Sequence, residues 1–248
     1  MHESRGELDM PISVASILLL LGLACATPAS ADRPGRKFKL LADQTTLSPD
    51  HQIRIEQFSR NLGDWHIVHQ FWTFDRSGKP ASLLNRNEDA DLAAYPAGFR
   101  FSPDSQWLVR MQKLGAGYQT LLLYRRDGNR FLPATKKPLG DLAWDYFFTL
   151  PASKGMRRDP KAPYSLDHMQ ANLLKGMEEN YAWLGEHWPE SRYVVISLSF
   201  DIQGQKQPTP WIEGRRCVYD VKTGRFSVPD GFADNNAKAI KLPGDRRD

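Results

Sequence analysis

The side chains that could do chemistry stand apart from one another in this sequence. His66 and His69 are three residues apart in an apolar run, and in a β-strand that spacing places them on opposite faces, so they are not expected to share a metal ion. Asp141 and Asp145 would need a common cleft for acid–base work. Cys217 lies in a strand-like run and is expected to be a small buried apolar group. The sequence therefore names no catalytic, cofactor-binding or metal-binding residue.

The sequence also lacks the local motifs of common catalytic and nucleotide-binding sites. It contains no G-x-S-x-G, H-E-x-x-H, phosphate-binding loop or G-x-G-x-x-G. Residues 85–91 alternate oxygen-bearing side chains as a calcium loop does, but the central glycine and the distal glutamate of such a loop are missing. We interpret this stretch as a solvated connection. No cofactor is expected.

One polar segment, residues 203–216, offers a candidate binding surface. It reads as a long hairpin loop that carries Trp211 between a proline and a glycine, with Arg215 and Arg216 close behind. A tryptophan in a polar loop can anchor a partner because it has little conformational entropy to lose. The alternative is that Trp211 packs under its own hairpin. Trp211, Arg215 and Arg216 are the only ligand-binding residues that the sequence suggests.

A repeated pattern indicates the elements that would position these residues. Three stretches, 48–86, 99–134 and 188–229, each run from a proline–acid turn through a strand, a loop and a second strand to a glycine turn. Valine, isoleucine and aromatic residues dominate the strands, and proline followed by an acid favours a turn before the first of them. Residues 193–200 alternate clearly between two faces. The pattern predicts antiparallel hairpins.

The second stretch carries a resemblance. FSPDSQWLVRM followed by QTLLLYRRDGNRF resembles the repeat of WD40-like β-propellers of the TolB type, and the chain looks like secreted bacterial proteins that carry such repeats. The resemblance implies propeller blades that present binding surfaces, and it brings no catalytic residues with it. The repeat spacing is irregular, so the expected fold class is mainly β, either propeller-like or an irregular β-sandwich, with one packed amphipathic helix.

That helix is expected at about residues 165–187, where apolar residues recur at spacings of three and four. It would pack on the sheet of a single β-rich domain over residues 40–232. A flexible basic leader is expected at 32–39, and a polar tail at 233–248.

The N-terminal residues predict export. An apolar run at 12–26 is too short to span a membrane, which takes about 20 residues, and it leads into an Ala-Ser-Ala cleavage site that ends at Ala31. Residues 1–31 are therefore interpreted as a signal peptide. An unusually acidic start leaves Met10 as an alternative first residue, and Cys25 leaves lipid anchoring open. We expect a periplasmic or extracellular protein without stable membrane insertion.

The charge distribution bears on the partner. The net charge of +4 is mild and the basic residues are dispersed, which argues against nucleic acid. The sequence therefore favours a non-catalytic binding or scaffold protein of the cell envelope that uses its hairpin loops to bind a protein or an envelope polymer. The alternative is a secreted hydrolase whose site is assembled from distant loops.

Overall fold

The computed structural model describes residues 34–64, 66–84, 94–115, 117–154, 156, 169–174, 192–200 and 211–241. Within these residues the fold is mainly β with a few short helices, so the predicted fold class is confirmed at that level. The predicted signal peptide lies outside the described residues.

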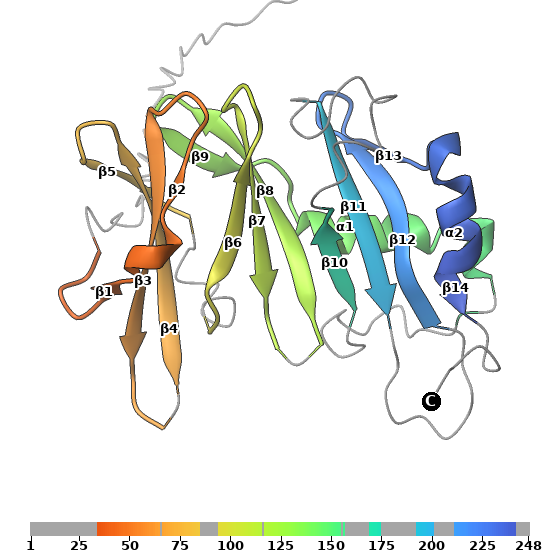
Figure 1. The fold of residues 1–248 in the computed structure, drawn as a ribbon, viewed down its shortest axis with the longest axis horizontal. Coiled ribbons are helices and arrows are strands. Elements are labelled where there is room, and N and C mark those ends of the chain that lie inside the picture. Colours follow the sequence, from red (N-terminus) through yellow and green to blue (C-terminus); the bar gives the residue numbers. More distant parts are fainter. Residues whose placement is uncertain are drawn as a thin grey trace, which may run out of the picture. The chain divides into compact units, whose positions relative to one another are not determined.

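The smaller sheet contains five strands in the order β1-β3-β4-β5, with β2 also beside β3 (Figure 1). Its strands are β1 (Lys39–Leu40), β2 (Thr46–Leu47), β3 (Ile53–Asn61), β4 (Ile67–Asp75) and β5 (Pro80–Leu83). A short 3₁₀ helix, η1 (Ala42–Gln44), separates β1 from β2 along the same edge of β3. Side chains at the start of β3 alternate between buried and partly exposed positions. This two-residue period matches a strand that has one face in the core.

The larger sheet contains nine strands in the order β13-β12-β11-β10-β8-β7-β6, with β9 beside β8 and β14 beside β12. Its strands are β6 (Ala97–Phe101), β7 (Trp107–Lys113), β8 (Gln119–Asp127), β9 (Arg130–Pro133), β10 (Gln170–Leu173), β11 (Tyr193–Phe200), β12 (Trp211–Asp220), β13 (Arg225–Ser227) and β14 (Ile240–Lys241). Among the described strands only β8 and β10 pair in parallel, through one residue pair, Gln119 with Gln170.

The repeated pattern in the sequence corresponds to matching local geometry. The hydroxyls of Ser48 and Ser102 each donate to the aspartate two residues later, at 2.6 and 2.7 Å. Each also accepts a backbone N–H from the residue five positions on, at 3.0 and 2.8 Å. His51 and Ser105 then take left-handed φ angles of 57° and 58°. Both turns thus lead into the first strand of a hairpin in the same way.

The two matching turns also contact each other. The backbone N–H of Asp50 donates to the Ser105 hydroxyl at 3.1 Å, and the Asp50 carboxylate pairs with Arg126. Behind this contact, buried residues from both sheets form one apolar cluster: Ile53, Ile55, Phe71, Leu84, Ala97, Phe101, Leu108, Tyr124 and Phe131. The first two repeats are therefore packed against each other by polar and apolar contacts.

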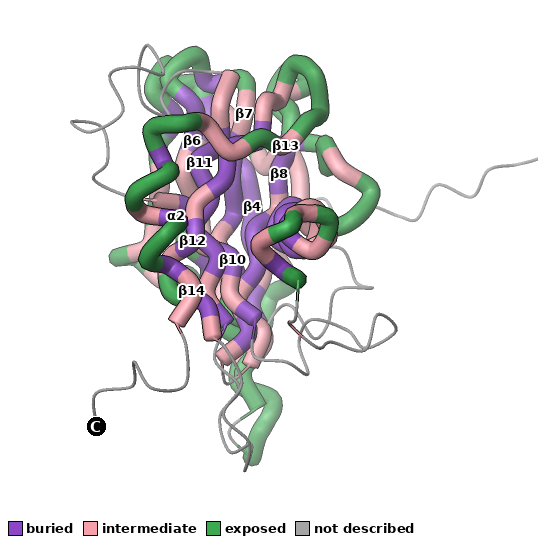
Figure 2. The backbone as a smooth tube through the Cα atoms, turned by 90° about the vertical axis from the view of Figure 1, so that its right-hand side faces the viewer, coloured by how far each residue is buried: buried purple, intermediate pink, exposed green. Residues whose placement is uncertain are grey.

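The main core lies between the larger sheet and helix α1 (Leu139–Phe147). Trp144 and Phe147 of this helix are about 1% exposed and pack edge to face at 5.7 Å. A Cβ on Gly140 would lie 2.8 Å from the Ala171 Cβ and 2.9 Å from the Leu121 backbone nitrogen, so glycine allows the helix to sit directly on the strands. Most residues of β11, and half of those of β10 and β12, are buried (Figure 2).

A second, smaller layer covers the opposite face of β11 and β12. There Val195 and Val218 pack with Phe232 of the 3₁₀ helix η7 (Asp230–Phe232), which leads into α2 (Ala233–Ala239). Helix α2 presents an exposed outer side in Figure 2. Both faces of β11 are therefore buried, although the sequence alternation had indicated one apolar face.

Three sequence predictions need correction. Within the span 165–187, predicted as a helix, the described residues Gln170–Leu173 form β10, because pairing with β11 outweighs the local helical spacing. The other described residues of that span are not helical either, and the rest lies outside the described part. Residues 211–216, expected in a loop, belong to β12, and residues 233–241 of the expected tail form α2 and β14.

The sheets of the described residues do not close into a ring. The three hairpins β3–β4, β7–β8 and β11–β12 are antiparallel as predicted. The resemblance to propeller repeats therefore stays an expectation, while the hairpin prediction is confirmed.

Candidate functional site

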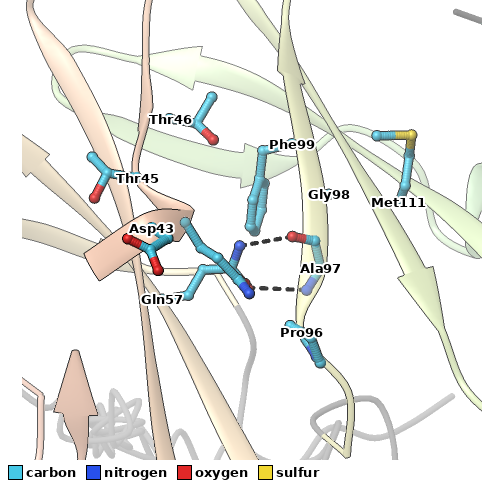
Figure 3. A pocket seen from close by; sticks show the side chains of 10 residues that line it. Asp43, Thr45, Thr46, Gln57, Pro96, Ala97, Gly98, Phe99 and Met111 are labelled. Atoms are coloured by element: carbon cyan, nitrogen blue, oxygen red, sulfur yellow. Dashed lines mark hydrogen bonds between the residues drawn. The ribbon is translucent and has the colours of Figure 1, made fainter. Parts of the chain in front are cut away.

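A pocket of about 430 Å³ lies beside β6. Its walls come from residues 43–46, which include the end of η1 and the start of β2, from Gln57 of β3, from residues 96–99 and from Met111 of β7. Figure 3 shows these side chains around the β6 ribbon. The pocket is thus lined by residues of both sheets.

Gln57 is fixed in place by β6. Its side-chain nitrogen donates to the Ala97 carbonyl at 2.7 Å, and its side-chain oxygen accepts the Ala97 N–H at 3.0 Å (Figure 3). Gln57 is 3% exposed because it follows Ile53 and Ile55 on the inward face of β3. A buried amide without partners would be costly, so this pair of bonds both satisfies Gln57 and holds β6 against the smaller sheet.

The remaining lining residues suit binding of a polar chain with some apolar groups. Thr45 and Thr46 contribute hydroxyls, Phe99 a ring and Met111 a thioether. Asp43 is the one titratable side chain among the described residues that line the pocket. General acid–base hydrolysis usually needs a second such group.

Asp141 is the described carboxyl group with an elevated pKa. Burial in the first turn of α1 raises the pKa of Asp141, although hydrogen bonds from Tyr118 and Thr120 to its Oδ1, at 2.9 and 3.0 Å, partly oppose this. Burial, together with the charge of Asp141, also raises the pKa of the Tyr118 hydroxyl. Asp141 and Tyr118 are the groups that best support the hydrolase alternative. However, the Oδ1 of Asp141 already accepts hydrogen bonds from Tyr118 and Thr120.

The structure places the predicted binding residues on β12. Trp211 is the first residue of that strand, is partly buried and pairs with Lys241 of β14. Arg215 is 9% exposed, donates to the Asn236 carbonyl at 3.2 Å and lies over the Phe147 ring at 5.4 Å. Burial lowers the pKa of Arg215. Its guanidinium group thus contacts both α1 and α2.

Arg216 is held by the side chain of Asn236 in α2. Its backbone N–H donates to the Asn236 Oδ1 at 2.7 Å, and its carbonyl accepts from the Asn236 Nδ2 at 2.9 Å. Arg215 and Arg216 lie in the same strand as Trp211, but the two arginines make these contacts within the protein. The segment therefore packs against α2.

The other sequence candidates lie apart. Cys217 is buried, and burial raises the pKa of its thiol to about 12, so the thiol stays protonated at neutral pH. His69 is buried and stacks beside Phe71, whereas His66 is exposed. Residues 85–91 lie outside the described part of the chain. Among the residues that the structure describes, no three histidine, cysteine or acidic side chains cluster as metal ligands.

Comparisons with known proteins give no family for this chain. No protein-family model matches it, and no curated protein sequence is significantly similar to it. In the described part of the chain, none of the helices has the length and apolar character needed to span a bilayer.

Sequence reasoning missed the pocket altogether. One signal was available: Gln57 stands at an inward position of an alternating strand, after Ile53 and Ile55. A buried glutamine needs hydrogen-bond partners, which predicts a backbone edge opposite it. The partner, Ala97, is 40 residues away and carries no signal of its own.

Proposed function

We propose that this chain is an exported, non-catalytic binding protein of the cell envelope that holds a protein or an envelope polymer in the pocket beside β6. The observation that carries the proposal is the lining of that pocket, in which hydroxyl, amide, ring and thioether groups accompany a single carboxylate. Such a surface offers hydrogen bonds and apolar contact but no pair of groups for proton transfer. The export component rests on the signal-like residues 12–31.

The proposal moves the binding surface away from Trp211. The Arg215 side chain and the Arg216 backbone already bond to α2, whereas Thr45 and Thr46 line an open pocket. The hairpin scaffold still positions the site, because β3 supplies Gln57 and the β6–β7 pair supplies the opposite wall.

Photo-crosslinking tests the proposal. A photoreactive amino acid in place of Thr46 lies in the pocket, and one in place of Leu132 lies at an exposed position of β9, outside the lining. Irradiation of cells should give a discrete adduct from position 46 and much less from position 132. Equal labelling from the two positions would contradict a binding site in the pocket.

The hydrolase alternative has its own test through Asp141. If the protein hydrolyses a polymer with this group, Asp141→Asn should abolish turnover by the purified protein. The binding proposal expects no turnover of envelope polymers by the wild type, and unchanged position-46 adducts in the Asp141→Asn variant.

A further inference from the structure

Strand β6 lies at an edge of the larger sheet. Its only strand neighbour among the described residues is β7, with Ala97 opposite Gln112 and Phe101 opposite Leu108. An edge strand presents every second N–H and C=O away from its neighbour.

Two contacts settle the direction. Both backbone groups of Ala97 bond to the Gln57 side chain, so Ala97 faces away from β7. The N–H of Ser102, just after the strand, donates to the Trp107 carbonyl at 2.9 Å, so the even-numbered residues face β7. The alternation of an antiparallel pair then directs the N–H and C=O of Phe99 outward.

Phe99 faces the pocket. Residues 97–99 and Gln57 all line it, so the outward groups of Phe99 lie on the pocket side of β6, one step beyond the groups of Ala97 that Gln57 occupies. The Gln57 side chain thus bonds to Ala97 as a neighbouring strand would. The next outward-facing residue, Phe99, lies beyond these bonds and faces the pocket.

The pocket also extends past both faces of the β6 edge. Figure 3 shows Phe99 and Gln57 on one side of the β6 ribbon and Met111 on the other. Successive side chains of an extended peptide point to opposite faces, so a strand laid along this edge would place one side chain near Phe99 and the next near Met111. An extended peptide also presents its own N–H and C=O groups toward such an edge at every second residue.

We propose that β6 binds an extended polypeptide segment by strand addition, with the N–H and C=O of Phe99 pairing with the backbone of the segment. The inference rests on the proposed function of the same pocket and specifies the partner as polypeptide. Main-chain bonds give such complexes their affinity, and alternate side chains give their specificity. Small apolar side chains fit beside Phe99 and Met111, and a cationic side chain suits Asp43.

The probe for this proposal is a short capped peptide in which threonine alternates with valine around one central lysine. We expect binding by calorimetry, with loss of binding when every backbone nitrogen of the peptide is methylated. On the protein side, Phe99→Pro removes the outward N–H, whereas Phe99→Leu removes the ring and keeps the N–H. Because that N–H faces away from β7, proline at this edge position leaves the β6–β7 hydrogen bonds intact.

Phe99→Pro should bind the peptide about tenfold more weakly than Phe99→Leu, the effect of losing roughly one hydrogen bond. If Phe99→Pro fails to fold, the amide resonance of Phe99 in the wild type tests strand addition instead. This resonance should shift when the peptide is added. Equal binding by the two folded variants, or an unmoved Phe99 resonance, would overturn strand addition.

The outcomes also separate this inference from the proposed function. Binding of a linear amino-sugar oligosaccharide in place of the peptide would overturn the polypeptide assignment and leave the pocket as a binding site. Failure of both probes, together with equal crosslinking from positions 46 and 132, would overturn both proposals.

Discussion

The side-chain amide of Gln57 bonds to both backbone groups of Ala97, at 2.7 and 3.0 Å, and so takes the place of a neighbouring strand. The same arrangement recurs at the other end of the larger sheet, where the Asn236 amide bonds to both backbone groups of Arg216. Both amides are buried. In each case a side chain from another element bonds to a position at which no described strand pairs on that side.

Loss of the Gln57 amide should destabilise the protein. Gln57→Leu leaves the N–H and C=O of Ala97 without partners in a buried position, at a cost of about 2–4 kcal/mol of unfolding free energy. Chemical denaturation of the two proteins measures the difference. A loss below about 0.5 kcal/mol would mean that water replaces the amide without cost.

Gln57→Glu is the matched control. Its carboxylate can accept the Ala97 N–H but cannot donate to the Ala97 carbonyl, whereas the protonated carboxyl can do both. Burial raises the folded-state pKa of this carboxyl, so the stability of the variant should be highest at low pH and fall as the pH rises through that pKa. A deficit relative to the wild type that does not change between about pH 4 and 7 would contradict this role for the amide.

The two matching turns allow a paired test of backbone strain. His51 is exposed and adopts a φ of 57°, which glycine accepts without the cost of about 1–2 kcal/mol that other residues bear. His51→Gly should therefore raise the unfolding free energy by up to about 1 kcal/mol, less than the strain itself because glycine also adds freedom to the unfolded chain.

Ser105→Gly relieves the same strain but also removes the hydroxyl that accepts the Asp50 N–H. It should therefore be no more stable than the wild type. Thermal unfolding of the two variants shows which of them is more stable. A more stable Ser105→Gly would show that the contact between the two turns contributes little.

The Asp50–Arg126 contact predicts a specific acid sensitivity. Partial burial opposes the charged form of Asp50, but hydrogen bonds from Ser48, Arg126 and the backbone of Gln52 outweigh it and hold the pKa at about 2, below the ordinary 3.8. The stabilisation is therefore present above about pH 4 and is lost as the pH falls toward 2.

The melting temperature of Asp50→Asn should thus be lower than that of the wild type at pH 6, and the gap should narrow between about pH 4 and 2. Asp104→Asn is the control, because Asp104 makes the equivalent bonds to Ser102 and Gln106 in the second turn. If the gap for Asp50→Asn stays constant down to pH 2, the Arg126 and Ser48 contacts do not set this pKa.

Close packing of α1 on the sheet predicts the effect of a single methyl group. Gly140→Ala places its Cβ against Thr120, Ala171 and the Leu121 backbone, and should cost about 1–3 kcal/mol although alanine favours helix. Gly115→Ala adds its Cβ in open space and should be neutral. Denaturant midpoints compare the two, and equal midpoints would place α1 further from β8 and β10.

The sequence predicts the local structure well where each signal is local. The serine–proline–aspartate turns are predicted well because their hydrogen bonds join residues two to five positions apart. The alternation in β11 predicts the strand, but not the burial of its second face, because Phe232 lies far along the chain from Val195. The helical spacing around Leu173 misled, because pairing of Leu173 with Ile196 in β11 is a long-range contact that no local period contains.

The candidate site is also built from residues that lie far apart in the sequence. Thr46 and Phe99 both line the pocket, and neither has a motif around it. Trp211 is a tryptophan in a polar part of the sequence, which suggested a binding loop. In the structure β12 and β14 pair at that residue. The residues that line the pocket belong to no sequence motif. They lie close together because the first two repeats pack against each other.

Amide hydrogen exchange at Phe99 and Gly98 shows whether the protein binds its partner at the edge of β6. Gly98 faces β7, so its N–H should exchange slowly with and without the alternating peptide described above. The Phe99 N–H should exchange fast in the free protein and become protected when the peptide is bound. A Phe99 amide already as protected as that of Gly98 in the free protein, or unchanged by bound peptide, would contradict the account.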